Sequence, residues 1–316
     1  MTYAFPMILS VALMLAPLSI GASQDDGTVV AKLGEQSITD RDVDFQLGRV
    51  ASESGQPLKE LSPAVMQASI YLLAQQRQAL QALRTRKQAV GREDVERWLE
   101  ANAQPPNGEK STAAELIREK ARQAGITESN LRDHWAFRLS WQRFLQQQLT
   151  DANVAKHFEN QRQRFNGTRF KVSIVDVAAP AGQSQRRDKL ASELKLQRSR
   201  LMSGDLKWKD LAAELSKAEP LQDQADKIRV REDLWARGTG DLEPTIISAL
   251  MKLEPSNYSE PIHTPTGVHL VKLIEIEPGS KELSEVRDEV RAHMLLHLLD
   301  HLARQAESQL PLKAIE

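Results

Sequence analysis

Apolar residues recur every three or four positions along most of the chain between residues 40 and 165, which is the spacing of amphipathic helices. Several of these helices have a recognisable start. Thr39, Thr112 and Thr127 stand where a helix N-cap is expected, and Pro63 stands at a first helical position, where its missing N–H is not needed. This part of the chain is therefore predicted to be a set of helices, preceded by one short alternating strand at 29–33.

The pattern changes after residue 166, where β-branched and aromatic residues gather in short runs. Strands are predicted at 170–177, 228–230 and 268–274, and helices at 185–203, 208–215, 244–253 and 283–308. This order of elements indicates an α+β chain and not an alternating β/α one. The last helix is amphipathic and has no core of its own. We therefore expect it to pack on the N-terminal helices, which makes the helical lobe discontinuous.

An uncharged N-terminal segment contains a nearly continuous apolar run from Met7 to Ile20. Its length is typical of a signal-peptide core and is short of the roughly 20 residues of a spanning helix. Small residues follow it, so we expect a signal peptide over residues 1–23. No Lys or Arg precedes the run, which leaves an uncleaved membrane anchor as the alternative. Either interpretation predicts an exported protein, periplasmic or otherwise extracytoplasmic.

Charge and cysteine content exclude several functions. The 42 basic and 43 acidic residues nearly cancel, whereas proteins that bind phosphate backbones carry a basic excess. Nucleic acid is therefore not an expected partner, and membrane contact is expected only through an uncleaved signal segment. The chain has no cysteine, which excludes disulfides, thiol nucleophiles and cysteine zinc sites. We expect no cofactor.

A histidine stripe runs along the last predicted helix. His293, His297 and His301 recur at every fourth position, a spacing that can hold zinc. No acidic residue completes a ligand set, and the stripe borders the apolar face that contains Met294 and Leu298. We interpret it as the polar edge of an amphipathic helix and predict no metal.

Three stretches of the chain carry a resemblance to a known family. Residues 29–47 resemble the mature N-terminus of SurA-type chaperones, with a strand, a glycine turn and a capped helix. Residues 153–165 resemble the helix that leads into their parvulin domain. Residues 256–273 resemble the parvulin C-terminal signature, with Thr264, Gly267 and His269 in the expected places. The chain is thus similar to SurA/PrsA-type foldases with a single PpiC-like parvulin domain.

The resemblance implies an architecture and a function. It implies a helical SurA-like lobe over 28–165, a parvulin-like domain over 168–278 with a small antiparallel sheet flanked by helices, and a C-terminal helix over 281–312 that packs on the lobe. It also implies peptidyl-prolyl cis–trans isomerase activity on unfolded or nascent exported polypeptides. An isomerase needs no nucleophile or metal. It needs an apolar clamp on the proline ring and polar groups that favour the twisted amide.

The resemblance assigns roles to five residues. Thr264 and His269 match catalytic positions, and Thr264 is placed to hydrogen-bond His269. Leu242, Ile246 and Met251 match the apolar substrate pocket. Each group has a second interpretation: the His–Thr pair as a structural remnant, and the apolar residues as ordinary core on the helix after Pro244.

Other family positions are not kept. Parvulins have a histidine in the first strand, and we place that position at Ile174. Their Cys or Asp position falls on Ala218, although Glu219 and Pro220 could replace the family's Asp-Pro if one residue is inserted. The glycine-rich turn is barely recognisable around Ala225 and Asp226. We therefore predict a degraded site with weak isomerase activity. The alternative is a non-catalytic holdase that uses the parvulin domain as a peptide-binding module.

Overall fold

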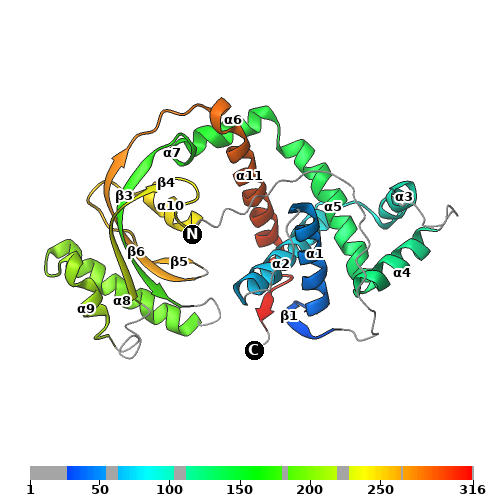
Figure 1. The fold of residues 1–316 in the computed structure, drawn as a ribbon, viewed down its shortest axis with the longest axis horizontal. Helices are drawn as coiled ribbons and strands as arrows, with labels where there is room; N and C mark the ends of the chain where they lie inside the picture. The colour runs from blue at the N-terminus through cyan, green and yellow to red at the C-terminus, as the bar shows by residue number, and fades with distance from the viewer. Residues whose placement is uncertain are drawn as a thin grey trace. The chain divides into compact units, whose positions relative to one another are not determined.

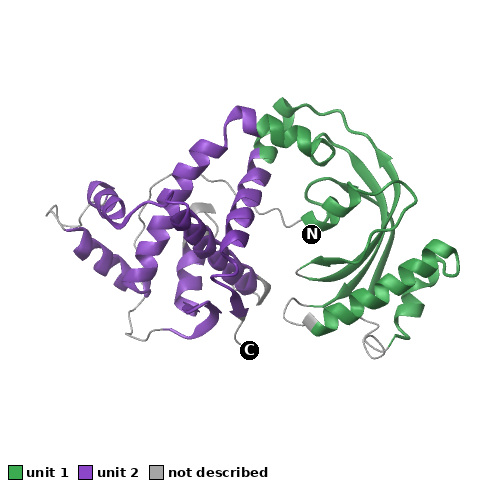
Figure 2. Cartoon of the chain, turned by 180° about the vertical axis from the view of Figure 1, so that it is seen from behind, with its two compact units in different colours: residues 1–5, 154–290 green, residues 6–153, 291–316 purple. Residues whose placement is uncertain are grey.

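The computed structural model describes residues 27–54, 63–102, 112–179, 184–218, 228–264 and 266–314. The predicted signal peptide and the turn around Ala225 lie outside these residues. The described chain forms two units (Figure 2). One unit holds residues 154–290. The other holds the described residues before 154 together with those from Arg291 onward.

The helical unit contains a small sheet that joins the two ends of the described chain. Its strands are β1 (Val29–Leu33), β2 (Gln36–Thr39) and β7 (Leu312–Ala314), in the order β2-β1-β7 with antiparallel pairing. Gly34 makes the β1–β2 turn with a φ of 59°, a conformation that favours glycine. The predicted first strand is confirmed, and β2 and β7 are additions that the pattern did not indicate.

Five helices follow β2 in the same unit (Figure 1). They are α1 (Asp40–Ser54), α2 (Pro63–Thr85), α3 (Arg92–Asn102), α4 (Ala113–Ala124) and α5 (Glu128–Gln148). The predicted caps are confirmed. Thr112 forms a capping box with Glu115, and the Thr127 side chain accepts a hydrogen bond from the Asn130 backbone N–H.

The C-terminal helix completes the core of this unit. Helix α11 (Leu283–Ala306) contributes Leu299, Leu302 and Ala306 to the same buried cluster as Leu83 of α2 and Phe144 of α5. The side-chain amide of Gln78 also donates to the Leu310 carbonyl oxygen at 2.8 Å. The expectation of a discontinuous helical lobe is thus confirmed.

A buried ion pair fixes the start of α1 against two other helices. Asp42 is almost fully buried and lies 3.0 Å from the Arg77 guanidinium of α2. Its other carboxylate oxygen accepts a hydrogen bond from the Asn130 amide of α5 at 2.9 Å. The Thr39 backbone N–H also donates to Asp42. A carboxylate with this many donors is well compensated for its burial.

The second unit is built on a four-stranded antiparallel sheet. Its strands are β3 (Arg169–Ala178), β4 (Ile228–Arg237), β5 (Ile262–Thr264) and β6 (Gly267–Glu277), in the order β4-β3-β6-β5. Strand β3 pairs with β6, which lies about 90 residues further along the chain. Strand β4 extends seven residues beyond the predicted end at 230, and it contains Asp233 at a φ of 52°.

Helices cover both faces of this sheet. They are α8 (Ser184–Ser203), the 3-10 turn η1 (Trp208–Asp210) and α9 (Leu211–Leu215) on one face and α10 (Pro244–Leu250) on the other, and α6 (Asp151–Asn160) and α7 (Arg162–Phe165) precede the sheet along the chain. Leu194 of α8 and Leu211 of α9 share a core with Val175 of β3. Ile247 of α10 shares a second core with Ile174 of the same strand. Alternate residues of β3 therefore face different helices.

The chain enters and leaves the sheet at one buried junction. The Asn166 side chain accepts hydrogen bonds from the Thr168 N–H and hydroxyl, and it donates to the Gly279 carbonyl oxygen. The Gly279 N–H donates to the Thr168 hydroxyl at 3.1 Å. A Cβ added at Gly279 would lie 2.1 Å from the Asn166 carbonyl oxygen. Only glycine fits this crossing.

These observations confirm the predicted α+β fold with an inserted antiparallel-sheet domain. The exact domain limits remain predictions. The division into units falls after residue 153 and after residue 290, within α6 and α11. We predicted the corresponding limits at 165 and 281.

Candidate functional site

The candidate site lies on the face of the sheet that packs against α10. His269 of β6 stands directly opposite Asp176 of β3 in the antiparallel register. Two residues along each strand, Ile174 and Val271 form the next pair on this face, and both belong to the α10-side core. The two polar side chains thus occupy the end of an otherwise apolar stripe.

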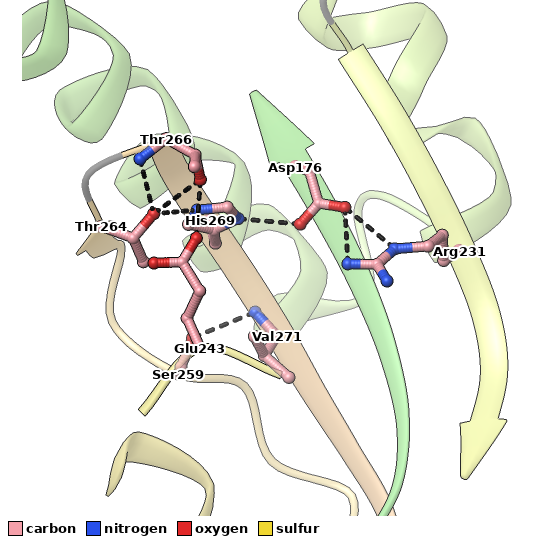
Figure 3. A network of polar contacts seen from close by, with 8 residues as sticks. All are labelled: Asp176, Arg231, Glu243, Ser259, Thr264, Thr266, His269 and Val271. Atoms are coloured by element: carbon pink, nitrogen blue, oxygen red, sulfur yellow. Dashed lines mark hydrogen bonds and ion pairs between the residues drawn. The ribbon is translucent and has the colours of Figure 1, made fainter. Parts of the chain in front are cut away.

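A continuous chain of short polar contacts runs through His269 (Figure 3). The Thr264 hydroxyl lies 2.7 Å from His269 Nε2, and the Asp176 carboxylate lies 2.8 Å from His269 Nδ1. The other Asp176 oxygen accepts hydrogen bonds from two nitrogens of Arg231 on β4, at 2.8 and 2.9 Å. Both ring nitrogens of His269 are engaged, and its side chain is only 7% exposed.

The chain continues from Thr264 to the start of α10. The Thr264 and Thr266 hydroxyl oxygens lie 3.0 Å apart, and the Thr266 backbone N–H also donates to Thr264 at 3.3 Å. The Thr266 hydroxyl lies 2.7 Å from a carboxylate oxygen of Glu243, the residue before α10. Figure 3 shows Glu243 reaching Thr266 from the side opposite Asp176.

The electrostatics of Asp176 favour its ionised form. Burial by itself raises the pKa of this carboxyl. The hydrogen bond from His269 and the positive charge of Arg231 act in the opposite direction and prevail, so the pKa of Asp176 lies below its ordinary value. The site therefore contains a carboxylate held next to the imidazole.

The turn between β5 and β6 is fixed by neighbouring backbone. Arg187 of α8 donates to the Thr264 carbonyl oxygen at 2.7 Å, and the Ala179 N–H donates to the Thr266 carbonyl oxygen at 3.1 Å. A Cβ at Gly267 would lie 2.1 Å from the Val177 carbonyl oxygen. Thr264 and Thr266 are thus presented by a turn that packs tightly against the end of β3.

Helix α10 has its own anchor. The Arg164 side chain of α7 is buried and donates to the Ser248 hydroxyl at 2.8 Å and to the Pro244 carbonyl oxygen at 3.4 Å. Burial lowers the pKa of this guanidinium. A cation in this position ties the start of α10 to the helix that precedes the sheet.

The structure separates the three predicted clamp residues by exposure. Ile246 is 2% exposed and belongs to the α10-side core. Leu242 and Met251 are partly buried and pack at the border of the same core. Leu242 and Met251 therefore keep apolar surface that a ligand could contact. Ile246 instead packs in the core between α10 and the sheet. The clamp remains a prediction.

The structure does not bring Ile174 to His269. Ile174 is fully buried and pairs with Val271. The β3 residue that faces His269 is Asp176, two positions further along, and sequence reasoning missed it. A single charged residue within the apolar run Val172–Val177 was the available signal, because a buried charge requires a partner. Ala218, at the predicted Cys/Asp position, follows α9 and offers no polar side chain.

No group of three or more His, Cys, Asp and Glu side chains in the part of the chain that the structure describes is placed to hold a metal ion. No described helix has the length and apolar character needed to cross a membrane.

Fold and site together define a parvulin-type domain carried by a helical lobe, and comparison with known proteins agrees. Residues 149–288 match the family of PPIC-type PPIase domains. The chain therefore contains a peptidyl-prolyl isomerase domain of this family.

Individual relatives are distant. The chaperone SurA of Aromatoleum aromaticum is 24% identical over 162 residues, which cover 51% of this chain and 35% of that protein. The match thus spans about a third of the relative's length. The solved structure of PrsA from Bacillus anthracis shares 18% identity and covers 73% of this chain and 94% of its own, with a TM-score of 0.34. A SurA-like chaperone of Campylobacter jejuni shares 11% identity over 92% of this chain and 100% of its own, with a TM-score of 0.25.

Proposed function

We propose that this chain is an exported folding factor that acts on unfolded polypeptides and whose parvulin domain is a weak prolyl isomerase. The observation that carries the proposal is the 2.7 Å contact between Thr264 and His269 inside a PPIC-type domain. Rotation about an X-Pro bond is slow without help, taking tens to hundreds of seconds. Polar groups next to an apolar surface can accelerate it by favouring the twisted amide.

We expect weak isomerase activity because the polar groups of the site are bound to one another and not free to contact a peptide. Both nitrogens of His269 are bound within the protein, to Thr264 and Asp176. His269 then acts as a positioning residue, and the buried Thr264 hydroxyl is likewise bound within the protein, to His269 and Thr266. Each polar contact missing from the twisted amide costs about 1–3 kcal/mol, or roughly 5- to 150-fold in rate. Ala218 offers no polar side chain at the position where we expect the family's Cys or Asp, so we expect the rate to be lowered by at least one such factor.

The test is an isomerisation assay on a short X-Pro peptide. We expect a rate well below that of a complete parvulin, and we expect Thr264→Ala and His269→Ala to reduce it further. His263→Ala is the matched control, because His263 lies on β5 next to Thr264 but is exposed. Activity equal to that of a complete parvulin would refute the degraded site. Activity that is unchanged in both variants would refute the site itself.

A holdase without catalysis is the second candidate. It is favoured by the burial of Ile246, which makes one of the three predicted pocket residues ordinary core. The same variants are then assayed for suppression of aggregation of an unfolded client. Full suppression by wild type without any isomerisation would establish this candidate. Loss of suppression in Thr264→Ala, with folding intact, would indicate that the parvulin domain itself holds the client.

Export is part of the proposal and rests on the apolar run from Met7 to Ile20. A signal peptide of this kind is removed in the mature protein. Mass spectrometry of the protein from native envelopes should find a new N-terminus between Ala22 and Gln24. A membrane-bound form that retains Met1 would support the uncleaved anchor instead.

A further inference from the structure

The number of protons in the polar chain through His269 can be counted from its contacts. Four contacts run in series between two carboxylates: Glu243 to Thr266, Thr266 to Thr264, Thr264 to His269, and His269 to Asp176. All four are 2.7–3.0 Å long, so each is a hydrogen bond that needs one proton between its two atoms. The chain needs four protons.

A neutral imidazole does not supply enough protons. Ionised carboxylates donate none, each threonine hydroxyl donates one, and a neutral imidazole donates one. That makes three protons for four contacts and leaves two oxygen or nitrogen lone pairs facing each other. An imidazolium donates from both nitrogens and brings the number to four. The donors then run outward from His269 to Asp176 on one side and through Thr264 and Thr266 to Glu243 on the other.

One alternative has the same number of protons. The fourth proton could reside on Glu243, with the hydroxyls reversed and His269 neutral. A glutamic acid ordinarily loses its proton about two pH units below an imidazolium, and Glu243 is not fully buried. Asp176 is held in its ionised form, which favours a positive neighbour. Both facts place the proton on the ring.

From these contacts we infer that His269 is an imidazolium at neutral pH, held between Asp176 and a hydroxyl relay that ends at Glu243. The neighbouring elements present two guanidinium groups there. Arg231 from β4 is bound to Asp176, and Arg187 from α8 is bound to the carbonyl oxygens of Thr264 and Ala179. Each guanidinium is thus engaged by another acceptor, whereas the relay from Glu243 leads to the imidazole.

The inference deepens the site of the proposed function and names Glu243 as a residue that sets its charge. In a Glu243→Gln variant the amide can donate to Thr266. The relay then reverses, and a neutral His269 satisfies all four contacts. The isosteric change therefore predicts a change in the protonation of a side chain that Glu243 does not touch.

The experiment is nitrogen NMR of the full chain labelled with ¹⁵N-histidine, with His269 assigned from the spectrum of His269→Gln. At neutral pH we expect both ring nitrogens of His269 to carry a proton in wild type. In Glu243→Gln we expect Nε2 to lose its proton while Nδ1 keeps the one it donates to Asp176. Glu277→Gln is the matched control, because Glu277 is a surface carboxylate at the far end of β6 that pairs with Arg169. It should resemble wild type.

A bare ring nitrogen on His269 in the wild-type protein would overturn the inference, and this result does not depend on any variant folding. Two protonated nitrogens in Glu243→Gln, as in wild type, would overturn the role of Glu243. Neither readout involves a client or an isomerase rate. Absence of isomerisation would therefore refute the proposed function but would not contradict the inferred charge of His269.

Discussion

Truncating one leucine near the C-terminus should destabilise helices that lie more than 150 residues before it. Leu302 of α11 is fully buried in the core that contains α2 and α5. Replacing a buried leucine by alanine removes its transfer free energy and leaves a cavity, which together cost about 2–5 kcal/mol. We therefore expect Leu302→Ala to lower the stability of the helical unit by this amount.

Hydrogen exchange of the native protein can locate the loss. Amides of α2 and α5 should exchange faster in Leu302→Ala by about tenfold for every 1.4 kcal/mol lost. Leu296→Ala is the matched control, since Leu296 lies on the same helix but is 50% exposed. It should change stability by less than about 0.5 kcal/mol. If α2 and α5 exchange as in wild type while α11 opens, the helices do not share a core and the discontinuous lobe is refuted.

Three further substitutions test the junction, the ion pair and the site. Gly279→Ala forces a Cβ against a backbone oxygen and should lower the melting temperature, whereas Gly91→Ala, where a Cβ meets nothing within 4 Å, should not. Asp42→Asn breaks a buried ion pair and should cost about 3–5 kcal/mol in urea denaturation, against at most about 0.5 kcal/mol for Asp94→Asn, whose helical pair is exposed. The pKa of Asp176 is lowered by folding, so its carboxylate adds stability above the ordinary pKa of about 4, and that stability is lost as pH falls through the lower folded-state value. Wild type should therefore exceed Asp176→Asn in stability at neutral pH, with the gap closing in acid. A gap that is constant with pH would contradict this.

Local chemistry explains which elements the sequence could predict. The helix starts at Thr112 and Thr127 are set by side chains within three residues of the cap, so the pattern is sufficient. Strand β7 has three residues, and it exists because β1 offers it an edge. Strand β5 is equally short and depends on β6. Nothing in such short segments carries a period that could be recognised.

Strand β4 was underestimated for a different reason. Its middle carries the charged run Arg229, Arg231, Glu232 and Asp233, which interrupts the apolar alternation. The strand lies at an edge of the sheet, where charged side chains are common and reduce unwanted pairing. One of these charges, Arg231, holds Asp176. The charged residues that made β4 hard to recognise in the sequence therefore include Arg231, which belongs to the candidate site.

Position 174 shows where sequence reasoning about this site had to stop. Side chains on a strand alternate with a period of two, so Ile174 and Asp176 lie on the same face. From the sequence alone, either of them could face His269. Which of them meets His269 depends on the register between β3 and β6, and that register shifts between Lys171 and Val172. Ninety-three residues separate Asp176 from His269, and no local signal spans them. The consequence is chemical as well as geometric. A histidine opposite His269 would compete with it for protons, whereas Asp176 supplies a negative charge that acts together with the relay to Glu243 in the imidazolium that we propose.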